Sequence, residues 1–246
     1  MDQHGKHRSL VRAICAGAAV AVLGAGPAVA QCRLALVLAL DISSSVDAAE
    51  DALQRAGLAA ALRAPEVVDA ILADPSAPVA LAVYEWSGRY QQDMVLNWTL
   101  LNSVPAIDNA AAAIAGSKRS YAEFPTAAGY GIGYAASVFD TAPPCLFQTL
   151  DVSGDGVNND GFTPEQAYAN FPLDDVTVNG LAIGGATPHD QDVFDFYLDQ
   201  VAKGPGSFVE TADDFQDFAR AMRRKLLREV EMRILGAVQD GGPPEG

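Results

Sequence analysis

The chain has 246 residues, half of them hydrophobic, and a formal net charge of −15. This length and hydrophobic content suit one globular domain with a sizeable core and exclude a disordered chain. The strong negative charge argues against nucleic acid and against an anionic membrane surface as partners.

Residues 1–30 have the pattern of a secretory signal peptide. A short basic start precedes a stretch of small and apolar residues, and Ala28-Val29-Ala30 is typical of a cleavage site. We therefore predict that the mature protein is periplasmic or secreted and has no membrane span. The alternative is a retained membrane anchor, but the uncharged span of residues 13–30 is short for that role. Cleavage would leave Cys32 and Cys145, a candidate disulfide in an exported chain.

The first predicted strand ends in a cluster of oxygen-bearing side chains. Residues 34–40 are all apolar, which is typical of a strand buried on both faces of a parallel sheet. Asp41, Ser43 and Ser45 follow at alternate positions, so an extended loop would point their oxygens the same way. Such oxygens suit Mg²⁺ or Mn²⁺. Alternatively, Asp41 and Ser43 only cap the next helix, and this stretch alone leaves both readings open.

Helices and strands alternate along the rest of the chain. We expect helices over residues 47–63, 67–72, 105–115, 126–136, 164–169, 192–201 and 213–235. We expect further strands over residues 79–86, 92–99, 146–152, 176–183 and 207–210. The order predicts an α/β domain over residues 31–235, with a doubly wound, mostly parallel central sheet and helices on both faces. Residues 92–99 would be an antiparallel edge strand, and residues 236–246 a disordered tail.

Two of these helices carry unusual patterns. Gly129, Gly131 and Gly133 are costly in a helix, and their expected use is close packing against a neighbouring backbone. They are not a phosphate-binding loop, because no lysine follows and no strand leads into them. The last helix carries a basic cluster, which we interpret as a solvated face (Arg223, Arg224, Lys225 and Arg228).

Three oxygen-bearing segments are expected to meet at one edge of the sheet. The carboxyl ends of parallel strands share an edge, where ligands bind, so Asp41 should lie near Asp155, which follows a later strand. Thr126 begins a predicted helix, where it would either cap the helix or coordinate a metal.

Together, these three segments resemble the von Willebrand factor A (VWA) domain and its metal-ion-dependent adhesion site (MIDAS). The pattern is Asp-x-Ser-x-Ser, then Thr with Gly three residues later, then Asp-Gly after a strand. The resemblance runs from about Cys32 to Arg233, and the chain is also similar to a bacterial exported branch of unknown function. It implies a VWA/Rossmann-like fold and a bound Mg²⁺ or Mn²⁺, with Ca²⁺ less expected. The implied metal ligands are Asp41, Ser43, Ser45, Thr126 and Asp155. An acidic residue of a protein partner would complete the coordination.

The same resemblance implies a particular disulfide. In the VWA family, the two strands that begin near Cys32 and Cys145 are neighbours, and neighbouring strands are close enough for a disulfide. A Cys32–Cys145 bond would join them at the sheet edge opposite the metal.

The third segment departs from the family pattern. Gly154 stands where the family usually has threonine, and Asp151 lies inside the strand, where an unpaired carboxylate would be costly. We expect Asp151 to be a structural residue with a partner, although a ligand role stays open. The segment from Asp151 to Asp160 also resembles the start of a calcium loop, but the twelfth position is Phe162 rather than glutamate.

The sequence favours a binding module over an enzyme. It has no Gly-x-Ser-x-Gly motif, and cleavage would leave His189 as the one histidine, so no histidine pair is available for zinc. Two alternatives remain: an Mg²⁺-dependent hydrolase that uses the same carboxylates, and a VWA scaffold that binds its partner without a metal.

Overall fold

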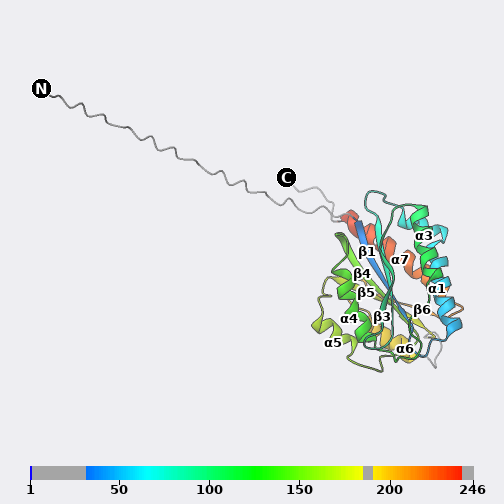
Figure 1. Ribbon diagram of the computed structural model, residues 1–246. Coiled ribbons are helices and arrows are strands. Elements are labelled where there is room, and N and C mark those ends of the chain that lie inside the picture. Colours follow the sequence, from blue (N-terminus) through cyan, green and yellow to red (C-terminus); the bar gives the residue numbers. More distant parts are fainter. Residues whose placement is uncertain (2–31, 185–190, 240–246) are drawn as a thin grey trace.

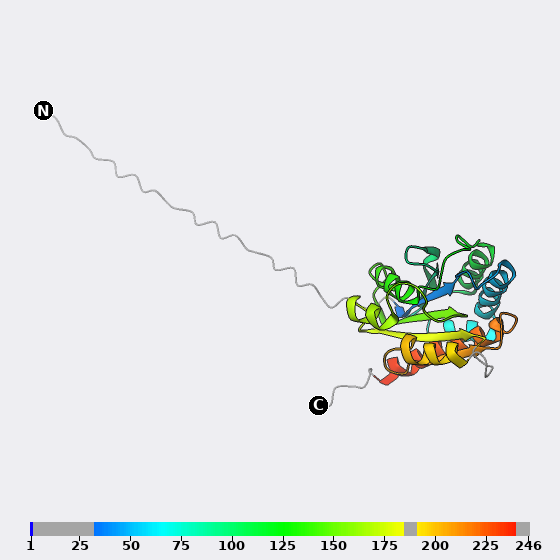
Figure 2. The same cartoon turned by 90° about the horizontal axis from the view of Figure 1, so that it is seen from below.

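The computed structural model describes residue 1, residues 32–184 and residues 191–239. Within these residues, a six-stranded sheet has helices on both faces (Figures 1 and 2). The strands are β1 (Cys32–Asp41), β2 (Val79–Trp86), β3 (Gln92–Leu101), β4 (Cys145–Gly154), β5 (Val176–Ile183) and β6 (Val209–Ala212). The helices are α1 (Ala48–Leu62), α2 (Pro65–Ile71), α3 (Val104–Gly116), α4 (Ala128–Phe139), α5 (Pro164–Asn170), α6 (Gln191–Phe196), the π-helix η1 (Tyr197–Val201) and α7 (Phe218–Gln239).

The strand order is β3-β2-β1-β4-β5-β6. β3 pairs with β2 antiparallel, and every other neighbouring pair is parallel. This topology confirms the predicted doubly wound sheet with one antiparallel edge strand. Strand order reverses between β1 and β4, so the carboxyl ends of these two strands form a switch point, where open α/β sheets bind ligands.

β1 is buried along its whole length, as its apolar sequence predicts. Its four leucines, at alternate positions, pack against α1, α2, α3 and α7. Ala35, Val37 and Ala39 face the other side, toward α4 and η1. Figure 1 shows α1 and α3 on one flank of the sheet and α4 and α5 on the other. The smaller side chains on the second face leave room for the glycine-rich α4 to approach closely.

The glycines of α4 do pack closely, but against two kinds of neighbour. A Cβ atom on Gly129 would lie 2.1 Å from the backbone oxygen of Phe162, as expected. On Gly131 and Gly133 it would instead lie 2.9 Å from the rings of Trp86 and Phe171. Aromatic rings therefore fill the space beside two of the three glycines.

The boundaries of α4 and α7 differ from the prediction. α4 begins at Ala128 and not at Thr126. α7 begins at Phe218 rather than residue 213, because a turn precedes it in which Asp214 Oδ1 accepts a hydrogen bond from Asp217 N at 2.9 Å. α7 also continues to Gln239, past the start of the predicted tail. The predicted signal sequence after residue 1, His189 and the rest of the tail (240–246) lie outside the described residues.

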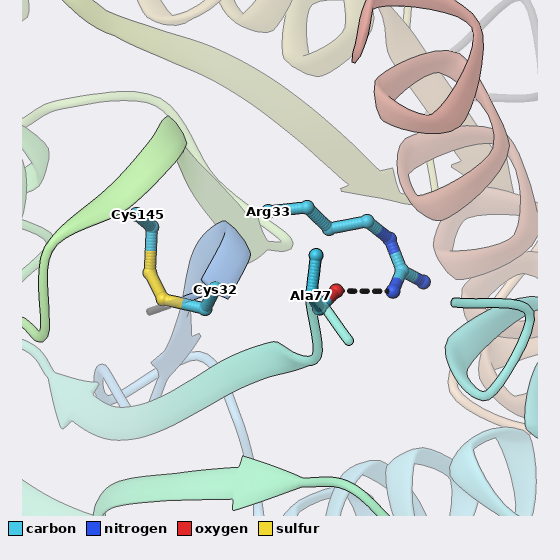
Figure 3. The surroundings of a disulfide bond; sticks show 4 residues. All are labelled: Cys32, Arg33, Ala77 and Cys145. Atoms are coloured by element: carbon cyan, nitrogen blue, oxygen red, sulfur yellow. Dashed lines mark hydrogen bonds between the residues drawn. A yellow bond between two sulfur atoms is a disulfide. The ribbon is translucent and has the colours of Figure 1, made fainter. Parts of the chain in front are cut away.

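The predicted disulfide is confirmed at the amino ends of β1 and β4. Cys32 and Cys145 are paired in the sheet register and are joined by a disulfide, with their Cα atoms 4.5 Å apart (Figure 3). Beside it, Arg33 Nη1 donates to the Ala77 carbonyl at 2.8 Å. The bond lies at the opposite end of β1 from Asp41. Among the helices described here, none has the length and apolar character needed to cross a membrane.

Candidate metal centre

The loop after β1 is fixed through its backbone. Asp41 is the last residue of β1, and its Oδ1 accepts a hydrogen bond from Ser43 N at 2.7 Å. Arg119 donates to three carbonyls of the loop, those of Ile42 at 2.7 Å, Ser43 at 2.8 Å and Val46 at 2.6 Å. The positions of the loop side chains therefore depend on an arginine from the segment between α3 and α4. A lone arginine in a polar loop matches no motif, so this role of Arg119 could not be predicted from the sequence.

The five predicted ligands gather at the carboxyl edge of β1 and β4. The hydroxyl oxygens of Ser43 and Ser45 lie 3.1 Å apart. Ser45 Oγ also donates to Asp155 Oδ1 at 2.7 Å, which joins the loop after β1 to the loop after β4. Thr126 is buried, and a Cβ atom on Gly156 would lie 3.5 Å from its Oγ1. The threonine therefore faces the loop that carries Asp155.

The side chain of Asp41 is an unusually buried carboxyl group with a raised pKa. It is 0% exposed, and its Oδ2 has no hydrogen-bond partner among the described residues. Burial and the nearby charge of Asp155 raise the pKa of Asp41 to about 7, although hydrogen bonds from Ser43 and the charge of Arg119 act in the opposite direction. A buried carboxylate oxygen without a partner is costly. A cation bound beside it would remove much of that cost.

The residues present fit a hard divalent cation. Two carboxylates and three hydroxyls offer only oxygen, which is what Mg²⁺, Mn²⁺ and Ca²⁺ prefer. Over residues 32–184 and 191–239, no three His, Cys, Asp or Glu side chains lie close enough together to hold a metal ion. A cation at this edge would therefore depend on the hydroxyls as well as on Asp41 and Asp155.

Gly154 has a steric reason to differ from the family's threonine. A Cβ atom at this position would lie 2.6 Å from Asp41 Oδ2 and 3.0 Å from Asp41 Cβ. A threonine here would force the Asp41 side chain or the β4 backbone to move. The glycine in place of the family's threonine is therefore explained by the close packing of Asp41 against Gly154.

The acidic residues of the calcium-loop pattern are not brought together. Asp151 Oδ1 lies 2.8 Å from Lys225 Nζ in the core, and Asp160 pairs with Arg89 at 2.7 Å. Asp155 instead contacts Ser45. Asp151 thus has the partner expected of a structural residue. The interpretation of Lys225 as part of a solvated face was wrong, since its side chain is 0% exposed.

Comparisons with known proteins give the fold and the family. The chain resembles proximal thread matrix protein 1 (PTMP1) from the mussel byssus, at 16% identity over 82% of this chain and 49% of that one, with a TM-score of 0.57. It also resembles a von Willebrand factor type A protein from Catenulispora acidiphila, at 20% identity over 81% of this chain and 43% of that one, with a TM-score of 0.53. It resembles the PilB minor pilin from Streptococcus sanguinis as well, at 12% identity over 89% of this chain and 65% of that one, with a TM-score of 0.55.

The chain spans less than two thirds of the length of each of these structures, and the identities establish the fold alone. No curated protein matches the sequence. The family described as "Protein of unknown function (DUF1194)" matches residues 31–234, nearly all of the described domain. The chain therefore has the VWA fold and belongs to the DUF1194 family.

Proposed function

We propose that this protein is an exported, non-enzymatic binding module that engages a protein partner through a divalent cation. The observation that carries the proposal is the buried, unpartnered Oδ2 of Asp41 beside a set of hydroxyls and a second carboxylate. The residues that would hold Mg²⁺ or Mn²⁺, and less readily Ca²⁺, are Asp41, Ser43, Ser45, Thr126 and Asp155. The bound cation would supply a positive centre for an acidic side chain of the partner.

Structural neighbours and the disulfide support this proposal. One structure of the mussel byssus protein PTMP1 is titled with a zinc-occupied MIDAS motif. Other neighbours are the pilus adhesin SpaC of Lactobacillus rhamnosus GG and the PilB pilin. The Cys32–Cys145 bond fits an oxidising compartment outside the cytoplasm, in agreement with the predicted signal peptide.

Thermal unfolding of the mature protein, titrated with Mg²⁺, Mn²⁺ and Ca²⁺, tests the cation site. A ligand that binds only the native state adds about 2.7 kcal/mol at a hundredfold excess over its dissociation constant. We expect Mg²⁺ or Mn²⁺ to stabilise the wild type but not Asp41→Ala. Asp160→Ala is the matched control, because Asp160 lies near the same edge but pairs with Arg89. If no ion stabilises the wild type, the cation-dependent proposal fails.

The two alternatives give different outcomes. A hydrolase would turn over a generic phosphate or ester substrate and lose that activity in Asp41→Ala. A metal-independent scaffold would bind its partner equally well with the metal removed by a chelator. The proposed module shows no turnover and loses its partner on chelation.

A further inference from the structure

Tyr197 places a buried hydroxyl beside the candidate metal centre. Its side chain is 0% exposed, and its hydroxyl has no hydrogen-bond partner within the described part of the chain. Asp41 Oδ2 is likewise buried and has no hydrogen-bond partner among the described residues. A Cβ atom on Gly154 would lie 2.6 Å from each of these two oxygens. The two unpartnered oxygens therefore border the same small space, with no direct hydrogen bond between them, at a separation that one water molecule can bridge.

Three local features allow this placement. Gly180 of β5 makes room for the ring, since a Cβ atom there would lie 2.6 Å from Tyr197 Cδ1. Gly154 of β4 makes room for the hydroxyl. Tyr197 also begins η1, where Ala202 N donates to the Tyr197 carbonyl at 2.8 Å across a π-turn. Turns of this type are rare and occur often at functional sites.

The hydroxyl of Tyr197 can act only as a neutral group. Burial, together with the negative charges of Asp41, Asp155 and Asp151, raises the pKa of Tyr197 well above its ordinary value. A tyrosine hydroxyl is in any case protonated below about pH 10, so toward a carboxylate or a water molecule it is a hydrogen-bond donor.

We propose that Tyr197 is a positioning residue for Asp41. Its hydroxyl donates a hydrogen bond to one bridging water, which in turn donates to Asp41 Oδ2, and so orients the carboxylate for the cation. The inference rests on the proposed function, because it concerns a ligand of the same cation. Hydrogen-bond partners of metal ligands fix the orientation of the ligand, and their loss typically weakens metal binding by about 10-fold to 100-fold.

The test is Mn²⁺ affinity of the mature protein, measured by water-proton relaxation, for the wild type and Tyr197→Phe. We expect Tyr197→Phe to weaken Mn²⁺ binding by about tenfold or more. The melting temperature of the metal-free variant should fall by less than that of Tyr84→Phe, because the removed hydroxyl makes no direct hydrogen bond to the protein. Tyr84→Phe is the matched control: Tyr84 is equally buried, but its hydroxyl donates to the Gly131 carbonyl at 2.7 Å. It should lower the melting temperature and leave Mn²⁺ affinity unchanged.

A second variant separates positioning from packing. Gly180→Ala should push the ring of Tyr197 aside and weaken Mn²⁺ binding, but cause no further loss in a Tyr197→Phe background, where no hydroxyl is left to displace. If the wild type and Tyr197→Phe bind Mn²⁺ within twofold of each other, the role of Tyr197 is disproved and the proposed function stands. If Tyr197→Phe weakens Mn²⁺ binding but also lowers the melting temperature of the metal-free protein as much as Tyr84→Phe does, Tyr197 has a packing role and the inference fails. If the wild type binds no Mn²⁺, both proposals fail.

Discussion

Lys225 carries a positive charge into the core between β4 and α7. Its Nζ lies 2.8 Å from Asp151 Oδ1 and 2.8 Å from Glu229 Oε1, and the three side chains are at most 1% exposed. Asn179 joins the group by donating to Glu229 Oε1 at 2.8 Å. A buried ion pair of this kind adds little net stability, but removal of one partner leaves an uncompensated charge in the core.

We expect Lys225→Met to lower the free energy of unfolding by about 3–5 kcal/mol, because two buried carboxylates would lose their cation. Urea unfolding followed by circular dichroism measures the change. Arg223→Met is the control from the same helix, since Arg223 forms a half-exposed pair with Glu66 at 3.2 Å and should cost less than about 1 kcal/mol. Equal stabilities of the two variants would contradict this account of Lys225.

The single residues that sequence could identify are those in short, regular patterns. Asp41, Ser43 and Ser45 alternate within one segment, and that spacing alone brings their oxygens together. Lys225 could not be distinguished from its solvated neighbours, because its partner Asp151 belongs to a distant strand. For the same reason, nothing in the sequence near Tyr197 indicated that its hydroxyl would lie near Asp41.

The loop after β1 and the segment before α4 behave as one element. Besides the three bonds from Arg119, Ser44 N donates to the Phe124 carbonyl at 2.8 Å. Within the loop, Val46 N donates to the Ser43 carbonyl at 3.0 Å. The hydroxyls proposed as ligands are therefore held in place by a segment that provides only one of the five proposed ligands, Thr126.

We expect Arg119→Met to loosen this element without unfolding the domain. Three loop carbonyls would lose a charged donor, and a hydrogen bond to a charged group is worth about 1.5–3 kcal/mol. Hydrogen exchange of the Ser44 and Val46 amides should accelerate, while exchange in the core strands stays slow. Arg63→Met, which removes a surface pair with Asp108, should leave those amides protected. Unchanged exchange in Arg119→Met would show that the arginine does not hold the loop.

At the scale of elements, strand prediction succeeded because the buried strands are continuous apolar runs that end at polar turns. Helix starts were less predictable. The turn before α7 depends on bonds between the side chains and backbone of Asp213, Asp214 and Asp217, and a row of acidic residues is equally compatible with a first helical turn.

Across the whole molecule, the disulfide and the candidate metal centre occupy opposite ends of the same two strands. We expect the double variant Cys32→Ser, Cys145→Ser to lose about 2–5 kcal/mol of unfolding free energy, because the bond closes a long loop. Mn²⁺ affinity measured well below the melting temperature should not change. Loss of Mn²⁺ binding in the folded variant would mean that the amino ends of the strands control the metal edge.

The overall topology was predictable because alternation of strands and helices, together with three motifs on one edge, leaves few possible arrangements. The disulfide followed from the family resemblance. The close packing around Gly154 could not be predicted, because it brings together Gly154, Asp41 and Tyr197 from three separate parts of the chain.

β1 begins and α7 ends at the same end of the molecule, beside the disulfide (Figure 1). Asp41 lies at the far end of β1. A carrier, surface or tag joined to either end of this domain would therefore hold it with the candidate site facing outward. A binding partner could approach that site from solution without meeting the linker, so immobilisation through either end should give the same binding curve.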